Sequence, residues 1–456
     1  MASSRTGMAN SFATRTSPNF ASLTSSLCIL SVKSEIKRRS GESEEERTME
    51  TVAKPLPLEG IRVVEWAQWQ QGPVAGMMLA DLGADVIKIE EPVGGDPARG
   101  FERVAGLITF KDGRNAYFEN NNRNKRSMAL NLKTGRGLEI AHQLIEKSDV
   151  FLHNFLPRVV EKLGLDEDSL RKRNPRLIYA VASGYGSKGP DADTPSFDYT
   201  GLARSGIMTM VGEPDMPPLR IEGGIVDQMG AIMTAYTVLG ALLVRERTGI
   251  AQRCDASLLG SMMWLQGLNV AIKLITGSEG QRTTRAKAPN PLWNYYKCAD
   301  GKWIALAHLQ ADRFWPAFCK TLGIEHLEHD PRYANAPARR ERGAELVPLI
   351  DNIFAQKPRA EWLRLLTDSG LICTQVSDFD DLVADPAALA NEYITEYDHP
   401  SWGRLKTIGF PATYAETPCK VRLPAPEHGQ HTEEILNEVL GYDWDEIVKL
   451  REDNII

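Results

Sequence analysis

The stretches GIRVVEW (Gly60–Trp66) and ADVIKIE (Ala84–Glu90) decide the fold class of this chain. Both are rich in β-branched residues, which favour strands. Between them, apolar residues recur at helical spacing from 73 to 82, with a proline in the first turn, where it is tolerated. Strand, helix and strand in this order form a βαβ unit. The pattern recurs at 138–151 and 177–182. The sequence therefore predicts an α/β fold with a parallel sheet and Rossmann-like βαβ units.

The rest of the chain indicates a second, smaller domain. Long helices are expected at 225–246 and 257–276, and the segment 293–306 has the pattern of a β-hairpin. Further helices are expected at 311–322, 341–354 and 359–369, and a final one from Thr432. We predict a leader at 1–54, a large domain formed by 55–284 and 401–456, and a small α+β domain at 285–400.

Composition and charge exclude several classes of protein. The chain has 456 residues, with 53 Lys and Arg against 60 Asp and Glu, which gives a formal net charge of -7. This balance argues against a general nucleic-acid or anionic-membrane binder. The longest uncharged stretch, Met229–Val244, is too short and too polar for a confident membrane span and is expected to be a buried helix. Six cysteines without a CxxC pair favour a reducing compartment.

The first fifty residues differ from everything that follows them. Residues 1–34 contain no Asp or Glu but many Ser and Thr among scattered basic residues, a mixture that resembles an organelle transit peptide. Residues 35–50 then alternate in charge and are expected to be disordered. The alternative is that Met49 is the true start. The expected location is cytoplasmic, or mitochondrial if residues 1–48 form a genuine transit peptide.

The familiar nucleotide and metal motifs do not fit. Gly72, Gly76 and Gly83 follow the first strand with spacing GxxxGxxxxxxG, whereas a dinucleotide-binding turn requires GxGxxG. GYGSKG (Gly184–Gly189) is not followed by the residues that complete a phosphate-binding P-loop. Two pairs of histidines three residues apart have no convincing third ligand. No metal site is predicted.

A series of longer motifs resembles one family in order along the chain. Among them are PLEGIRVVEWAQWQQGPVAGMMLADLGADVIKIEEPVGGDPAR (Pro57–Arg99), NNRNKRSMALNLKTGRG (Asn121–Gly137), DVFLHNF (Asp149–Phe155) and EGGIVDQMGAIMTAYTVLGALLVRERTGIAQRCDASLL (Glu222–Leu259). They resemble the class III, CaiB/BaiF-type coenzyme A transferases, a group that includes formyl-CoA transferases and the related α-methylacyl-CoA racemases. The resemblance extends from residue 55 to the C-terminus. It implies an enzyme that moves CoA from an acyl-CoA thioester to a carboxylic acid.

The resemblance implies that Asp227, after the pair Gly223–Gly224, is the nucleophile. Attack on the thioester would give an aspartyl-acyl anhydride and then an aspartyl-CoA thioester. We expect the dipole of the following helix to keep this carboxylate ionised. From spacing alone, the simpler interpretation of Asp227 is a helix N-cap. Asp198 is expected to have a structural role.

Family contacts to CoA map onto several positions of this chain. The expected CoA-binding residues are Gln70, Gln71, Leu130, Lys133, Asn154, Phe155 and Lys162. Glu91 stands where some relatives have an arginine near the nucleotide, and Lys125, Arg126 and Lys133 form a candidate basic cluster for the phosphates. CoA thioester is expected as a substrate, with no permanently bound cofactor. The resemblance also implies an interlocked homodimer.

Two other functions stay open from the sequence. The racemase branch needs a histidine where this chain has Phe197, so racemisation or isomerisation on the same fold is the weaker alternative. A non-catalytic relative that binds acyl-CoA is disfavoured because Asp227 and its two glycines are intact.

Overall fold

The structure is a computed structural model that describes residues 55–456 except 101–102, 105–106, 109–114 and 279. The predicted leader at 1–54 lies outside the described residues, so its nature stays a prediction.

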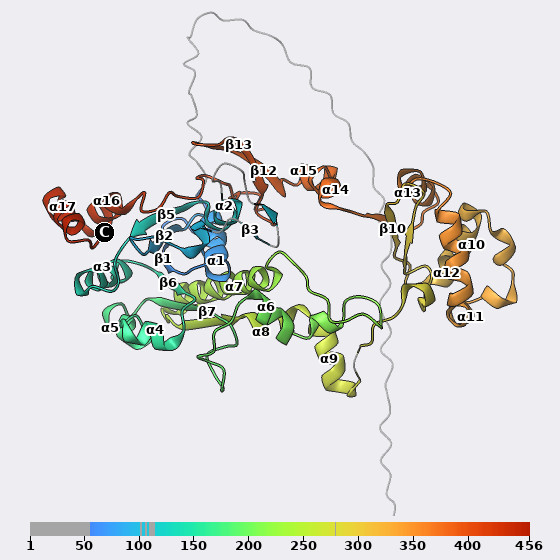
Figure 1. Ribbon diagram of the computed structural model, residues 1–456, viewed down its shortest axis with the longest axis horizontal. Coiled ribbons are helices and arrows are strands. Elements are labelled where there is room, and N and C mark those ends of the chain that lie inside the picture. The colour runs from blue at the N-terminus through green and yellow to red at the C-terminus, as the bar shows by residue number, and fades with distance from the viewer. Residues whose placement is uncertain (1–54, 101–102, 105–106, 109–114, 279) are drawn as a thin grey trace, which may run out of the picture. The chain divides into compact units, whose positions relative to one another are not determined.

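A six-stranded sheet forms the centre of the fold (Figure 1). Its strands pair in the order β5-β2-β1-β6-β7-β8, and every pairing is parallel. The strand bounds are β1 (Arg62–Trp66), β2 (Asp85–Glu90), β5 (Lys125–Ala129), β6 (Val150–His153), β7 (Ile178–Ser183) and β8 (Arg253–Ser257). The prediction of a parallel α/β sheet is confirmed.

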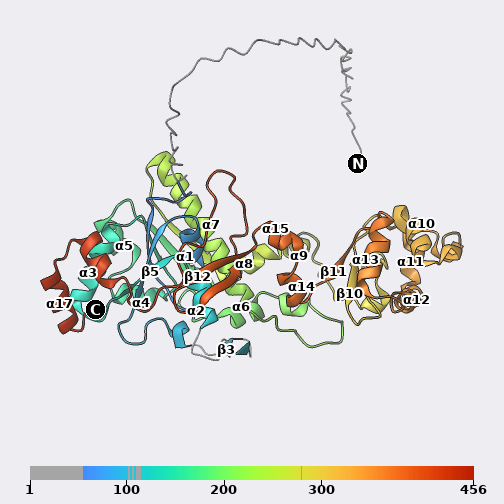
Figure 2. The ribbon, with the colours of Figure 1, turned by 90° about the horizontal axis from the view of Figure 1, so that it is seen from above.

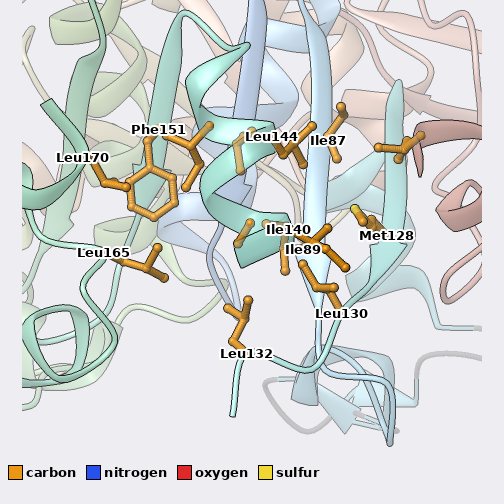
Figure 3. Close-up of a cluster of buried hydrophobic side chains, with 14 of the residues drawn as sticks. Ile87, Ile89, Met128, Leu130, Leu132, Ile140, Leu144, Phe151, Leu165 and Leu170 are labelled. Carbon is orange, nitrogen blue, oxygen red and sulfur yellow. The ribbon is translucent and has the colours of Figure 1, made fainter. Parts of the chain in front are cut away.

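Helices cover both faces of this sheet, because alternate side chains of its strands point to opposite sides. Val63, Val86 and Ile178 pack against helices α1 (Gln71–Asp81) and α7 (Ile225–Thr248) on one face. Val64, Ile87 and Phe151 face the other way. They pack against α3 (Gly135–Glu146), α5 (Glu167–Arg173) and the C-terminal elements (Figure 3). The result is three layers around two hydrophobic cores.

The C-terminal segment joins the layer that covers the second face. It comprises α16 (Thr432–Glu434), a π-helical turn η6 (Ile435–Leu440) and α17 (Trp444–Glu452). Ile435, Ile447 and Leu450 belong to the same core as Ile140 and Leu144 of α3. Figures 1 and 2 both show α17 beside α3. The predicted helix from Thr432 is therefore confirmed but divided into shorter elements.

The long apolar helix α7 has the length and composition of a candidate membrane span. It nevertheless packs against α1, β7 and β8, and Val226, Ala231, Ala235 and Val238 are fully buried. One side of α7 is therefore buried as expected, but the expectation of a wholly buried helix is wrong, since Tyr236 is 69% exposed and Leu243 is 51% exposed.

The prediction of a single continuous helix over 257–276 is wrong. The chain forms two helices, α8 (Leu258–Leu265) and α9 (Gly267–Thr276), that meet at an angle of 80°. Gln266 between them has left the helical conformation, and its Nε2 donates to the carbonyls of Ser205 and Met262. Gly267 follows directly and weakens helix continuation.

A separate hydrophobic core includes Leu292, Phe318, Ile350 and Leu371. It is built on an antiparallel sheet of β9 (Tyr295–Lys297), β10 (Trp303–Leu306) and β11 (Cys373–Val376). Its helices are α10 (Ala311–Leu322), α11 (Ala336–Glu341), α12 (Gly343–Phe354) and α13 (Arg359–Asp368). The predicted hairpin is confirmed. The domain limits 285 and 400 stay predictions.

The remaining elements are short. They are η1 (Pro97–Gly100), β3 (Arg103–Val104), β4 (Leu107–Ile108), α2 (Ala116–Asn122), α4 (Pro157–Lys162), α6 (Asp198–Arg204), η2 (Ile207–Thr209), η3 (Arg285–Lys287), η4 (Glu325–Leu327), η5 (Pro331–Tyr333), α14 (Phe379–Val383), α15 (Pro386–Ala390) and the hairpin β12 (Ile394–His399) with β13 (Gly403–Ile408).

Candidate active site

Asp227 is the third residue of α7, and the interpretation of it as an N-cap is wrong. The cap position belongs to Gly224, whose φ of 67° is left-handed and therefore favours glycine. Asp198 at the start of α6 supplies the capping side chain instead: its Oδ1 accepts from the backbone N–H of Val226 at 2.8 Å and of Asp227 at 3.2 Å. This contact agrees with the expected structural role of Asp198, and it leaves the Asp227 carboxylate available for other chemistry.

The expectation that the helix dipole keeps the Asp227 carboxylate ionised needs correction. Burial raises its pKa to about 7, and the neighbouring Asp198 carboxylate adds to the rise. The helix dipole favours the ionised form, but desolvation and like-charge repulsion outweigh it. Asp227 is thus a carboxyl group that is only partly ionised at neutral pH.

Asp227 lines a cavity of about 250 Å³, which we call the Asp227 cavity. Four of the predicted CoA-binding residues line it too: Gln70, Gln71, Asn154 and Phe155. They come from the turn after β1 and from the end of β6, two neighbouring strands of the sheet. Because parallel strands end at the same edge of a sheet, residues distant in sequence meet here.

Hydrogen bonds hold the turn that contains the two glutamines. Gln68 and Asn154 exchange two of them: the N–H of Gln68 donates to Oδ1 at 3.0 Å and Nδ2 donates to the Gln68 carbonyl at 2.8 Å. Gln70 Nε2 donates to the carbonyl of Gly224 at 3.1 Å. A Cβ on Gly224 would lie 2.3 Å from Gln70 Oε1, so glycine permits this close approach. The turn is thereby fixed against the start of α7.

A second cavity of about 690 Å³ adjoins the first, and we call it the Lys133 cavity. The other predicted CoA-binding residues, Leu130, Lys133 and Lys162, line it. Gln68 and Phe155 line both cavities, and the Trp66 ring stacks on Phe155 with centroids 3.9 Å apart. All seven predicted CoA-binding residues therefore lie along two adjoining cavities.

Sequence reasoning missed two residues of this region. Arg158 lines the Lys133 cavity four residues before Lys162 on α4, a spacing that could have signalled a shared helix face. Tyr117 lies near Asp227: its pKa is raised by burial and then by the charges of Asp227, Asp96 and Asp198. No motif pointed to Tyr117.

The predicted basic cluster is wrong for two of its three members. Lys125 is completely buried, where its Nζ lies 2.7 Å from Glu65 Oε2, and burial lowers its pKa to about 8. Arg126 pairs with Asp85 at 2.6 Å and with Glu434 at 2.9 Å. Lys133 alone lines the cavity, and its Nζ pairs with Glu91. Among the residues that the structure describes, the exposed cations that line this cavity are Lys133, Arg158 and Lys162.

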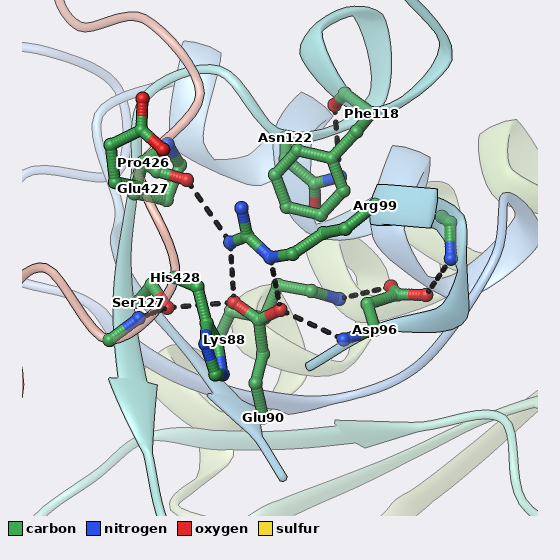
Figure 4. Close-up of polar contacts among 12 residues, drawn as sticks. Lys88, Glu90, Asp96, Arg99, Phe118, Asn122, Ser127, Pro426, Glu427 and His428 are labelled. Atoms are coloured by element: carbon green, nitrogen blue, oxygen red, sulfur yellow. Dashed lines mark hydrogen bonds and ion pairs between the residues drawn. The ribbon is translucent and has the colours of Figure 1, made fainter. Parts of the chain in front are cut away.

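A buried network of ion pairs stabilises the turn after β1. Lys88 Nζ lies 3.0 Å from Glu65 Oε1 and 2.9 Å from Asp96 Oδ2, and it donates to the carbonyl of Ala67 at 2.7 Å. Asp96 Oδ1 in turn accepts from the N–H of Trp69 at 3.2 Å, a residue with a left-handed φ of 67°. Figure 4 shows the neighbouring pair of Glu90 with Arg99. The network ties the loop after β2 to the turn after β1.

The position that would distinguish a racemase holds no proton-transfer group. Phe197 precedes α6, is 62% exposed and lines the Asp227 cavity. Its ring can only add apolar surface there. Within the described part of the chain, no group of three or more His, Cys, Asp or Glu is placed to hold a metal ion.

The raised pKa of Asp227 predicts a pH dependence. A carboxylate nucleophile must be ionised, so kcat/KM for acyl-CoA should rise about tenfold per pH unit below a midpoint near 7 and level off above it. Asp198→Asn keeps an oxygen acceptor for the two N–H groups but removes the repelling charge, so it should move the midpoint to lower pH. Steady-state kinetics between about pH 5 and 9 measure both. A flat profile over this range would contradict the prediction.

Comparison with known proteins agrees with this geometry. The chain is 33% identical to (R)-2-hydroxy-4-methylpentanoate CoA-transferase of Clostridioides difficile over 404 residues, which cover 88% of this chain and 99% of that protein. It is 32% identical to succinyl-CoA:glutarate CoA-transferase of Mus musculus over 394 residues, 86% of this chain and 89% of that protein. The crystal structure of a CaiB/BaiF family protein from Brucella suis matches with a TM-score of 0.75 and 30% identity, covering 85% of this chain and 100% of that one. The model of CoA-transferase family III matches residues 58–432, so this chain belongs to that family and is an enzyme that transfers CoA.

Proposed function

We propose that this enzyme moves CoA from an acyl-CoA to a carboxylic acid through covalent intermediates on Asp227. The main support is the position of the carboxylate: it lines a cavity at the start of α7 and makes no ion pair among the residues that the structure describes. A carboxylate that no cation neutralises is a competent nucleophile once ionised. The Asp198 bonds to two N–H groups keep the helix start in place around it.

The proposed reaction balances without any other reactant. An Asp227 oxygen attacks the thioester carbon, the C–S bond breaks, and CoA leaves as thiolate. The thiolate attacks the Asp227 carbonyl of the anhydride and releases the first carboxylate. The second carboxylate then attacks the Asp227 carbonyl of the aspartyl-CoA thioester, which forms a second anhydride and releases CoA thiolate. The thiolate attacks the acyl carbonyl of the second acid in this anhydride, and the new acyl-CoA forms. Asp227 returns as a carboxylate.

The two cavities match the two ends of a CoA ester. Its phosphates need cations, which Lys133, Arg158 and Lys162 offer at the Lys133 cavity. Its uncharged arm needs an apolar wall with a few polar groups, which Phe155, Gln70 and the other residues of the Asp227 cavity offer. Because the cavities share Gln68 and Phe155, one extended ligand could reach from the cations to Asp227.

Covalent trapping tests this proposal. The protein is incubated with an acyl-CoA and treated with borohydride, and the peptide with Asp227 is then analysed by mass spectrometry. We expect the Asp227 carboxyl to be reduced to an alcohol, because borohydride reduces an acyl anhydride or thioester but not a free carboxylate. Asp198 serves as an internal control and should stay unmodified. An unmodified Asp227 in a protein that turns over would overturn the proposed mechanism.

We also propose that the enzyme acts as a homodimer. Large apolar side chains on α7, α8 and α9 are between 69% and 82% exposed: Tyr236, Trp264, Leu268, Leu274 and Ile275. Exposed large apolar side chains on neighbouring helices are typical of an interface that a second subunit covers.

A further inference from the structure

His153 is a buried polar residue on the wall of the Asp227 cavity to which no function has been assigned. It ends β6, is 2% exposed and lines the cavity. Its Nδ1 accepts from the N–H of Phe155 at 3.3 Å. Its Nε2 has no hydrogen-bond partner among the described residues. Buried polar atoms are nearly always paired, so an unpaired one on a residue that lines a cavity is a candidate contact for a ligand.

The hydrogen bond at Nδ1 decides what Nε2 can do. Because Nδ1 accepts, the proton of a neutral imidazole is on Nε2, which is then a donor. Burial, and after it the charge of Arg253, lowers the pKa of His153 to about 3, so the ring is neutral at physiological pH. The Tyr179 ring lies edge-on with centroids 5.1 Å apart, and an aromatic face is at most a weak acceptor. Nε2 is therefore a neutral donor that finds no strong acceptor in the described part of the chain.

The charges around this part of the cavity select the kind of acceptor. Arg253 is a cation of the wall, and it pairs with Asp255 at 2.7 Å. Asp166, Glu167 and Asp227 also line the cavity and add further carboxyl groups. This excess of acidic side chains would repel an anionic ligand group, but it would not repel an uncharged carbonyl or hydroxyl oxygen.

We propose that the Nε2–H of His153 binds an uncharged carbonyl or hydroxyl oxygen of the CoA ester in the Asp227 cavity. The proposal rests on the proposed function, because it assumes that the ester lies there. Such an oxygen occurs in the amide-bearing arm of CoA and can also occur in the acyl group. In either case this contact fixes how deep the CoA ester lies in the cavity relative to Asp227. His153 is then a residue that binds the substrate.

Binding measurements separate these sources. Calorimetry is done on protein with Asp227→Ala, so that no transfer occurs, using free CoA and butyryl-CoA. A double variant carries Asp227→Ala and His153→Phe, which keeps an aromatic ring but removes the donor. We expect it to bind about tenfold more weakly than the Asp227→Ala protein. Equal losses for both ligands assign the oxygen to the arm of CoA; a loss confined to butyryl-CoA assigns it to the acyl group. His153→Gln offers a side-chain N–H and should restore part of the affinity.

The outcomes distinguish this inference from the proposed function. If Asp227→Ala protein with His153 intact binds neither ligand, the proposed function fails. If it binds both and His153→Phe changes neither affinity, the His153 inference alone is wrong. Should His153→Phe not fold, ¹⁵N NMR of the unaltered His153 gives the answer. A shift of its Nε2 resonance on addition of CoA or butyryl-CoA supports the contact, and an unchanged resonance with both ligands refutes it.

Discussion

Replacing Asp227 with alanine should lower kcat for CoA transfer by a factor on the order of 10⁴, because the proposed mechanism forms both covalent intermediates on this carboxylate. The same replacement should leave KM for acyl-CoA nearly unchanged, since Gln70, Asn154 and the cations of the Lys133 cavity remain. Initial rates with an acyl-CoA and an added acid measure both constants. A kcat within about tenfold of the wild-type value would show that Asp227 is not the nucleophile.

Stability measurements on Asp227→Asn distinguish loss of chemistry from loss of fold. The folded-state pKa of about 7 lies above the ordinary 3.8, so the folded protein binds the proton more tightly than the unfolded chain does. The contribution of the Asp227 carboxyl to the free energy of unfolding is fully present below about pH 4 and is lost as the pH rises through 7. The amide of the Asp227→Asn variant carries no charge, so at about pH 8 this variant should be more stable than wild type by about 1 to 3 kcal/mol. Urea unfolding measures the difference, and a less stable variant would contradict the assigned environment.

Replacing Lys88 with methionine should destabilise the protein by about 3–5 kcal/mol, since removal of one partner leaves buried charge uncompensated. Lys88 is 0% exposed between Glu65 and Asp96, whose charges outweigh burial and raise its pKa. The change also removes the bond to the Ala67 carbonyl in the turn before Gln70. Denaturant unfolding monitored by circular dichroism gives the free energy of unfolding.

Lys133→Met is the matched control for this prediction. Lys133 pairs with Glu91, but its side chain is 76% exposed, so solvent screens the interaction and the loss should stay below about 1 kcal/mol. This control should instead weaken CoA binding, because Lys133 lines the Lys133 cavity. A Lys88→Met variant as stable as Lys133→Met would show that the buried network contributes little to the fold.

The contrast between Lys125 and Lys133 shows where sequence reasoning about the site failed. Both lysines belong to the same basic stretch of sequence, and nothing local distinguishes them. Lys125 begins β5 and points into the layer between the sheet and α1, where Glu65 neutralises it. Lys133 follows the strand end, where side chains reach the cavity. Since both faces of a parallel sheet are covered, a strand lysine needs a buried counter-charge that only the folded chain reveals.

The sequence by itself determined the parallel sheet, the hairpin of the second core, the family and the group of residues around Asp227, because periodicity and ordered motifs are local properties of the chain. The break at Gln266, the Asp198 cap on α7, the burial of Lys125 and the neutral donor at His153 were decided only by the tertiary structure. So was the pKa of Asp227. Each of these depends on desolvation or on a partner distant in sequence, and distance and burial exist only once the strands and helices have packed.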